Sequence, residues 1–195
     1  MIGIVILNYN TPEDVINCAR SIYKETHEID FKIYIVDNAS TNDSVAIIKE
    51  FCKQYKDICF IQAAENNGFS AGNNIGIKAA ISDRCEYVCL INADVILLND
   101  AISISVKKLE NDAELGMVAP IIVTNKPETE SQFARNKLTF ASYLTEKTFL
   151  KRTNFFNKKY PRYQKRGNFE EDYKFLGMTY GCMYTGRASF FGKFL

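Results

Sequence analysis

The stretch LINADV, residues 90–95, is an apolar run that ends in an amide and a carboxylate, Asn92 and Asp94. An unpaired charge is costly to bury, so a carboxylate at this place indicates that the chain leaves the core there. We therefore expect residues 86–91 to form a buried strand. Its polar end, from Asn92 to Asp94, should reach the surface and face a ligand.

Similar apolar runs along the rest of the chain predict further strands. They are residues 2–7, 33–36, 58–62 and 117–123. The segments between them carry apolar residues at helical spacing and begin near Thr11, Asn42, Ser70 and Asn99, with the third helix expected over 70–81. Thr11 is expected to cap the first helix, and Asp14 to complete an acidic capping box. Strands that alternate with helices predict an α/β fold whose central sheet is mostly parallel and flanked by helices.

Polar residues follow four of the predicted strands. The strand ends are Asn8 to Asn10, Asp37 to Asn38, Glu65 to Gly68, and Asn92 to Asp94. In an open parallel sheet these ends share one edge, where such folds bind ligands. A single Asn or Asp at a strand end is commonly a turn residue or a helix cap. Four such ends together predict a shared binding crevice that contains both Asp37 and Asp94.

The sequence narrows the class of ligand. The first strand is followed by NYNTPED, residues 8–14, which lacks the GxGxxG of dinucleotide-binding domains, and no Walker sequence occurs. The only histidine, His27, lies in the polar stretch KETHEID and is expected to be solvated, so no catalytic Ser-His-Asp or Cys-His set is indicated. An acidic crevice is a poor phosphate site unless a cation is present. Mg²⁺ or Mn²⁺ held by Asp94 would bridge this carboxylate to the phosphates of a substrate.

Three glycines in the third helical segment are spaced four residues apart: Gly68, Gly72 and Gly76. On a helix they share one face, which predicts a smooth stripe that packs closely on the sheet. Gly68 also lies at the helix entrance, where free N–H groups favour an anion.

Composition indicates one soluble domain. The chain has 195 residues, of which 47% are hydrophobic and 24% charged. Its six cysteines contain no Cys-x-x-Cys pair, the first residues do not resemble a signal peptide, and no run approaches 18 apolar residues. These features predict reduced thiols and a cytoplasmic location.

The charge is unevenly distributed. Residues 135–166 contain ten Lys or Arg and one acid, a net charge of +9 that leaves −8 for the remainder of a chain whose total is +1. The segment is interleaved with Phe and Tyr. It is read as a solvated loop or as a surface for anionic membrane or a lipid-diphosphate acceptor. Nucleic acid is not expected, because no nucleic-acid-binding motif accompanies the charge.

The motifs together resemble the inverting GT-A-fold glycosyltransferases of the family 2 type, which include rhamnosyltransferases and enzymes of capsule or O-antigen synthesis. The matching pieces are VILNYN (5–10), VDNASTNDS (36–44), NNGFSAGNNIGIKAA (66–80) and LINADV (90–95). The resemblance implies a Rossmann-like GT-A domain over 1–195. Residues 1–125 would be its nucleotide-sugar-binding half, and 126–195 a partial acceptor-side region.

The resemblance also implies roles for single residues. Leu7, Asn8 and Tyr9 match the loop that lies against the nucleotide, and Asp37 matches the carboxylate that meets the base or ribose. Asn67 and Gly68 match the segment near the base and diphosphate. Asn92-Ala93-Asp94 stands at the family's DxD-like metal motif, with Asp94 as the ligand of Mg²⁺ or Mn²⁺ and Asn92 as a hydrogen-bonding partner. The expected donor is a UDP-, dTDP- or GDP-sugar, and the acceptor is a saccharide or lipid-linked hydroxyl in cell-surface polysaccharide synthesis.

The resemblance departs at the end of the chain. Family members typically continue from a segment like YGCMYTGRASFFGKF, residues 180–194, into a stretch that carries the general base. The base is therefore expected beyond residue 195, and the chain is expected to be a shortened member. Two alternatives stay open here: a remnant that binds nucleotide without transferring sugar, and a sugar-nucleotidyltransferase. The latter would want a glycine-rich, basic loop after the first strand, which residues 8–14 lack.

Overall fold

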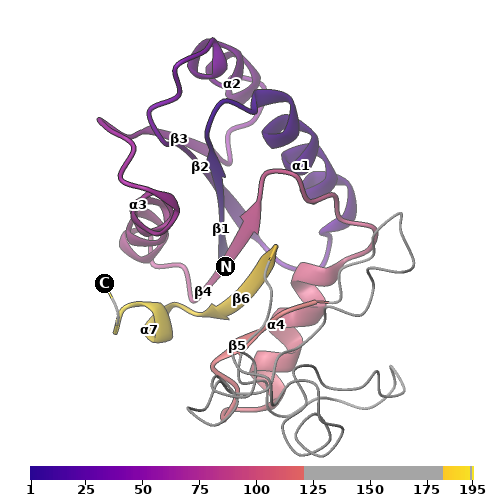
Figure 1. The fold of residues 1–195 in the computed structure, drawn as a ribbon. Helices are drawn as coiled ribbons and strands as arrows, with labels where there is room; N and C mark the ends of the chain where they lie inside the picture. Colours follow the sequence, from indigo (N-terminus) through magenta and orange to yellow (C-terminus); the bar gives the residue numbers. More distant parts are fainter. Residues whose placement is uncertain (121–181, 194) are drawn as a thin grey trace, which may run out of the picture. The chain divides into compact units, whose positions relative to one another are not determined.

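The computed structural model describes residues 1–120, 182–193 and 195, and within them the chain forms a six-stranded sheet with helices on both faces (Figure 1). The elements in chain order are β1 Ile2–Asn8, α1 Pro12–Glu25, β2 Phe31–Asp37, α2 Ser44–Cys52, β3 Ile58–Gln62, α3 Phe69–Ser82, β4 Tyr87–Asn92, α4 Ala101–Asn111, β5 Met117–Val118, β6 Met183–Arg187 and α7 Ala188–Phe191. Met1–Pro120 and Cys182–Leu195 belong to one compact unit.

The sheet has the strand order β3-β2-β1-β4-β6-β5. The first four strands of this order are parallel, whereas β6 runs antiparallel to both β4 and β5. The register pairs Asn8 with Asp37 on β2 and Leu7 with Asn92 on β4. The α/β fold with a mostly parallel sheet is thus confirmed, and the predicted polar strand ends lie on one edge.

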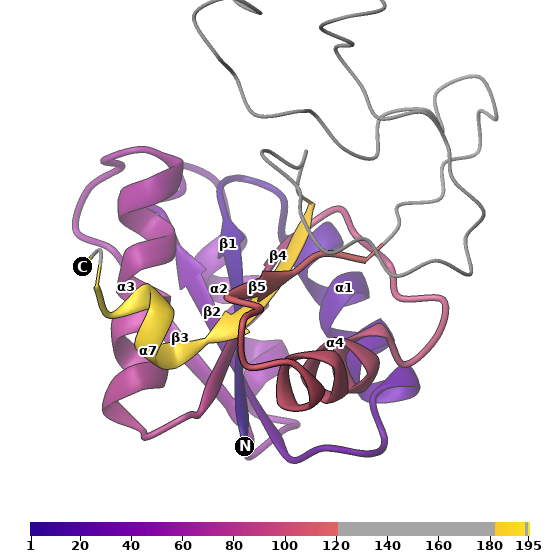
Figure 2. The ribbon, with the colours of Figure 1, turned by 90° about the horizontal axis from the view of Figure 1, so that it is seen from below.

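Alternate residues of β1 face opposite helical layers. Ile2, Ile4 and Ile6 pack into the core formed with α1, α2 and α4, while Val5 packs into a second core with α3 and α7. Figure 2 shows α1 and α4 on one side of the sheet and α3 and α7 on the other. Because β1 is covered on both faces, it reads as a continuous apolar run rather than an alternating one.

The glycine stripe of α3 explains how closely this helix approaches the sheet. A Cβ atom at Gly76 would lie 2.4 Å from Val5 Cγ1, and one at Gly72 would lie 2.5 Å from Leu7 Cδ1. Neither space admits a methyl group, so the predicted close packing is confirmed. Gly68, at the N-cap of α3, has a φ of +88°, which disfavours a side chain there.

Several predicted boundaries are corrected. The Thr11 side chain makes no capping hydrogen bond; instead the Thr11 N–H donates to Asn8 Oδ1 at 3.2 Å. The expected strand 117–123 is β5 over Met117–Val118, and its last three residues lie outside the described part of the chain. The strand β6 was not expected. The division at residue 125 and the basic segment 135–166 also lie outside the described residues and stay predictions.

No helix within the described ranges is long and apolar enough to cross a membrane.

Candidate functional site

Asn8 and Asp37 form a buried polar centre at the carboxyl edge of the sheet. Both side chains are fully buried. Asn8 Nδ2 donates to Asp37 Oδ1 at 2.7 Å and to Ser40 Oγ at 3.0 Å. The Ser40 N–H donates to the second carboxylate oxygen, Asp37 Oδ2, at 3.0 Å. The Asp37 carboxylate therefore has no exposed surface, whereas the family resemblance implies that it meets the base or ribose.

A second set of hydrogen bonds joins the loop after β1 to the loop after β2. The Asn10 N–H donates to Ser40 Oγ at 3.0 Å, and Asn10 Oδ1 accepts from the Thr41 N–H at 2.9 Å. Asn42 Nδ2 donates to the Asn10 carbonyl at 3.2 Å. Asn10 and Ala39 have positive φ angles of 63° and 56°, a conformation that is uncommon for residues other than glycine. The two loops thus form one hydrogen-bonded wall.

Tyr9 projects from this wall. It lies between Asn8 and Asn10, both of which are hydrogen-bonded into the network, and its side chain is 47% exposed. Leu7, two residues before Tyr9, is half-buried and packs against α3 at Gly72. Of the three residues predicted for this loop, Tyr9 alone offers a large exposed surface to a ligand.

The loop before α3 borders the same edge. Asn66 Oδ1 accepts from Asn38 Nδ2 at 2.8 Å and from the Gly68 N–H at 2.9 Å. Asn67 and Gly68 are both exposed, and Asn67 Nδ2 donates to Glu65 Oε1 at 2.9 Å. The hydrogen bonds of Asn66 to Asn38 and Gly68 thus place the predicted residues Asn67 and Gly68 at this edge of the sheet.

The end of β4 brings Asp94 to the surface, as the opening motif predicts. The Asn92 N–H donates to the Cys182 carbonyl at 2.7 Å, and the Val95 N–H donates to the Asn92 carbonyl at 3.2 Å, which turns the chain. Asp94 is exposed, and its carboxylate accepts no hydrogen bond from any residue that the structure describes. Asn92 is half-buried at the strand end.

Two thiols lie close enough to Asp94 for its charge to raise their pKa. Burial raises the pKa of the Cys18 thiol to about 12, and Cys89 and Asp94 add to the rise. Burial followed by the charge of Asp94 also raises the pKa of Cys182. Burial and the nearby Asp94 carboxylate thus disfavour the thiolate form of both cysteines.

The residues at this edge suit a hard divalent cation that the protein would bind through a single carboxylate. Within residues 1–120 and 182–193, no group of three or more His, Cys, Asp and Glu side chains is arranged to hold a metal ion. A closed protein cage is therefore not formed by these residues. Mg²⁺ and similar ions are commonly bound by one or two carboxylates, with waters and substrate phosphates as the other ligands. Asp94, exposed and unpaired among the described residues, suits that arrangement.

Ser40 was not predicted as a member of the network. The signal that could have found it is that an Asp side chain at a turn commonly accepts a hydrogen bond from a backbone N–H a few residues later. Asn10 and Asn66 were predicted to lie among the polar strand ends, but their bonds to the neighbouring loops depend on loop geometry that only the packed loops define. The predicted residues Asn8 and Asp37 are joined directly.

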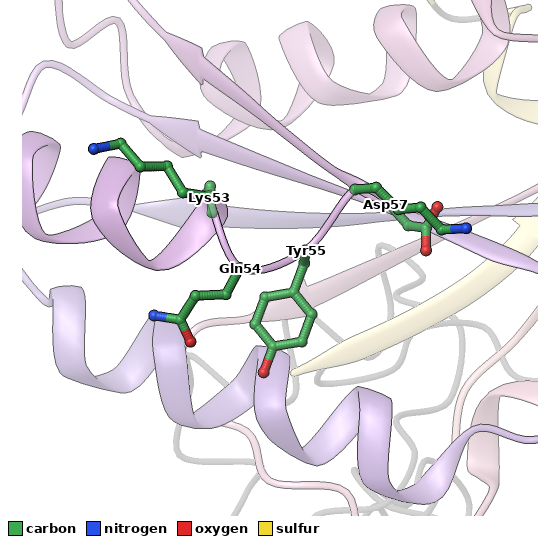
Figure 3. Close-up of a pocket in the computed structure, with 6 residues that line it drawn as sticks. Lys53, Gln54, Tyr55 and Asp57 are labelled. Atoms are coloured by element: carbon green, nitrogen blue, oxygen red, sulfur yellow. The ribbon is translucent and has the colours of Figure 1, made fainter.

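An open pocket elsewhere does not belong to this edge. It is lined by residues 52–57 in the loop between α2 and β3 (Figure 3). The Asp57 carbonyl accepts from the Ile33 N–H near the start of β2. The pocket therefore lies at the opposite end of the strands from Asp37.

The family model described as glycosyl transferase family 2 matches residues 3–191. The teichoic acid poly(glycerol phosphate) polymerase of Staphylococcus epidermidis is 32% identical over 128 residues, which cover 64% of this chain and 17% of that protein. Glycosyltransferase GlyG of Streptococcus pneumoniae is 27% identical over 116 residues, covering 59% of this chain and 37% of GlyG.

Solved structures show the same fold. A mannosyltransferase from Pyrobaculum calidifontis in complex with GDP-Man and Mn²⁺ has a TM-score of 0.57 and 18% identity, over 74% of this chain and 45% of that one. S. aureus TarS in complex with UDP-GlcNAc has a TM-score of 0.53 and 16% identity, over 71% of this chain and 40% of that one. This chain thus spans less than half the length of these relatives.

Proposed function

The chain belongs to glycosyl transferase family 2, and from this premise we propose that it takes part in transferring a sugar from a nucleotide-diphosphate donor to an acceptor hydroxyl with inversion. One observation carries the proposal: Asp94 stands exposed and unpaired, among the described residues, at the sheet edge that also holds the Asn8–Asp37 centre. This edge is the place where open parallel sheets bind ligands.

In this proposal the wall formed by the loops after β1 and β2 receives the nucleoside. Tyr9 supplies an exposed aromatic surface for the base. Asn67 and Gly68, at the entrance of α3, lie near the base and diphosphate. The backbone N–H groups at such a helix start favour an anion. Asn92 supports the turn that places Asp94.

Asp94 would hold Mg²⁺ or Mn²⁺, with the donor phosphates completing its ligands. When bound, such an ion stabilises negative charge on the departing nucleoside diphosphate. Support comes from the mannosyltransferase neighbour, which is in complex with GDP-Man and Mn²⁺, and from the TarS neighbour, which is in complex with UDP-GlcNAc. The donor of this chain is accordingly proposed as a UDP-, dTDP- or GDP-sugar.

The acceptor is proposed to be a saccharide or a lipid-linked hydroxyl in the synthesis of a cell-surface polymer. Relatives named for teichoic acid and polysaccharide synthesis support this class. The basic segment 135–166, with its ten Lys and Arg residues, supports peripheral contact with anionic lipid at the cytoplasmic face of the membrane. No general base is assigned among the described residues.

The experiment that tests the proposal is a calorimetric titration of UDP, dTDP and GDP, each with and without Mn²⁺, into the full chain. We expect one nucleotide to bind in a metal-dependent manner. Asp94→Asn should abolish the metal-dependent part and leave the melting temperature unchanged, since the carboxylate has no partner among the described residues. Asp57→Asn, an exposed site at the opposite end of the sheet, is the matched control.

Unchanged metal-dependent binding in Asp94→Asn would contradict the metal assignment. A folded wild-type chain that binds none of the three nucleotides would contradict the donor site. Nucleotide binding without turnover, measured with the matching sugar donor and a saccharide acceptor, would favour a binding role instead.

A further inference from the structure

We propose that Asp37 is a positioning residue: its carboxylate acts through Asn8 and Ser40 to hold Tyr9 in place for the nucleoside, and does not itself contact the nucleotide. This inference rests on the proposed function of the carboxyl edge. It differs from the expectation of direct contact with the base or ribose.

The Asp37 carboxylate is enclosed by its own hydrogen-bond partners. Asp37 is 0% exposed, and each of its oxygens already accepts a hydrogen bond. Asn8 Nδ2 donates to Oδ1 at 2.7 Å, and the Ser40 N–H donates to Oδ2 at 3.0 Å. A nucleotide would have to displace Asn8 or Ser40 to reach either oxygen. An ionised carboxylate makes stronger hydrogen bonds than a neutral acceptor, so this displacement is unfavourable.

The hydrogen-bond network of Asp37 also continues to both neighbours of Tyr9. Asn8 precedes Tyr9 and bonds Asp37 directly. Asn10 follows Tyr9, and its N–H donates to Ser40 Oγ at 3.0 Å. The same Oγ accepts from Asn8 Nδ2 at 3.0 Å. The backbone on each side of Tyr9 is therefore tied to the same carboxylate, directly or through one residue.

The loops after β1 and β2 also adopt backbone conformations that need support. Asn10 and Ala39 have positive φ angles, which cost free energy and persist only where surrounding contacts hold them. Ala39 lies between Asp37 and Ser40, inside the turn that Asp37 Oδ2 closes. Loss of the carboxylate should therefore relax both loops and release Tyr9.

An exchange of side chains separates positioning from direct contact. Asp37→Asn places an NH₂ group where two donors, the Asn8 amide and the Ser40 N–H, need two acceptors. We expect nucleotide affinity to fall by about tenfold or more, the scale of one lost charged hydrogen bond. The double variant Asn8→Asp with Asp37→Asn moves the carboxylate across the pair. The amide at position 37 then donates to the carboxylate at position 8, and its carbonyl accepts from the Ser40 N–H.

We expect the double variant to regain most of the nucleotide affinity that Asp37→Asn loses, because the bond between residues 8 and 37 is re-formed and the Ser40 hydroxyl can donate to the carboxylate at position 8 instead of accepting from the Asn8 amide. A carboxylate that touches the nucleotide would have moved away from it, and affinity would stay low. Asp43→Asn is the matched control, since it removes the same charge from the same loop at an exposed side chain that makes no capping bond.

A spectroscopic measurement follows the position of residue 9 without any nucleotide. The chain has no Trp, so Tyr9→Trp introduces its only indole. In that background, Asp37→Asn should lower the fluorescence anisotropy of the indole, and the exchanged pair should restore it. Ser40→Ala should also lower it, which covers the case in which Asp37→Asn does not fold.

The outcomes are distinct. Restored melting temperature and anisotropy in the double variant, without restored affinity, would show direct contact and overturn the proposal. Unchanged anisotropy and affinity in Asp37→Asn and Ser40→Ala would also overturn it. A wild-type chain that binds no nucleotide would instead refute the donor site, whatever the anisotropy shows.

Discussion

Gly76→Ala is expected to destabilise the protein because α3 packs on β1 with no room for a methyl group. The new Cβ would lie 2.4 Å from Val5 Cγ1 and 3.1 Å from Val36 Cγ2. Both valines are fully buried, and a β-branched side chain has few alternative rotamers with which to yield. Lateral movement of Val5 is further limited, since its strand pairs with β2 and β4 on both sides.

The magnitude follows from two opposing terms. Overpacking a filled core costs about 1–3 kcal/mol, and Ala is better than Gly in a helix interior by about 0.5–1 kcal/mol. We expect a net loss of about 1–2 kcal/mol, or a fall in melting temperature of about 2–8 °C for a chain of this size. Urea unfolding followed by circular dichroism measures the free energy of unfolding.

A double-mutant cycle identifies the clash as the cause. Val5→Ala alone should cost about 2–3 kcal/mol through the cavity it leaves. In the double variant the methyl at position 76 enters the space that Val5 vacates. The loss of unfolding free energy in the double variant should therefore be smaller than the sum of the two single losses by about 1 kcal/mol or more. Lys78→Ala, exposed on the same helix, should stay within about 0.5 kcal/mol of wild type. A Gly76→Ala variant as stable as wild type, or strict additivity in the cycle, would refute the packing argument.

Two further predictions concern stability. Asp100 accepts hydrogen bonds from two backbone N–H groups, one at the start of α4 and one before β2, so Asp100→Ala should cost about 1–2 kcal/mol in urea unfolding. Thr11→Ala should cost less than about 0.5 kcal/mol, because the Thr11 side chain makes no cap bond. Equal losses of stability in Asp100→Ala and Thr11→Ala would contradict the conclusion that Asp100 caps its helix and Thr11 does not. The hydrogen bonds from Lys32 and then Tyr34 lower the pKa of Asp83 from its ordinary 3.8. Its stabilising effect is therefore present above that value and lost as the pH falls through the lower folded-state pKa. The melting-temperature difference between wild type and Asp83→Asn should be small, because the Asp83 side chain is 41% exposed. This difference should be constant near pH 7 and should disappear at strongly acidic pH. A difference that persists in acid would refute the ion-pair origin.

The candidate site divides into a buried part and an open part. The buried part is the centre of Asn8 and Asp37 with the loops that it ties together. The open part consists of Tyr9 and Asp94, which are exposed at the same edge.

Local patterns were sufficient to predict the elements that alternate along the first 111 residues. The strand over 58–62 has the predicted bounds, and the helix expected over 70–81 spans Phe69–Ser82. Hydrophobic period and helix-start residues act within a few positions of one another, so they can be read from the sequence. The meeting of Asp37 with Asn8 was also foreseeable, because parallel strands place their carboxyl ends on one edge.

The β6 strand could not be predicted from the local sequence pattern. Its residues, MYTGR, carry no clear apolar alternation, and the strand pairs with β4, 92 to 100 positions earlier in the chain. Pairing across such a distance depends on the intervening chain and on the space left beside β4. Neither is encoded within the strand itself.

The alternation of strands and helices, the shared edge of polar strand ends and the exposure of Asp94 after a buried strand all follow from local patterns in the sequence. The enclosure of Asp37, with Tyr9 and Asp94 left open, follows from the packed loops. The exposure of a strand-end carboxylate depends on which loop folds over it. Here Ser40 and Asn8 supply the donors that make burial of Asp37 favourable, and those donors come from two separate loops brought together by the sheet.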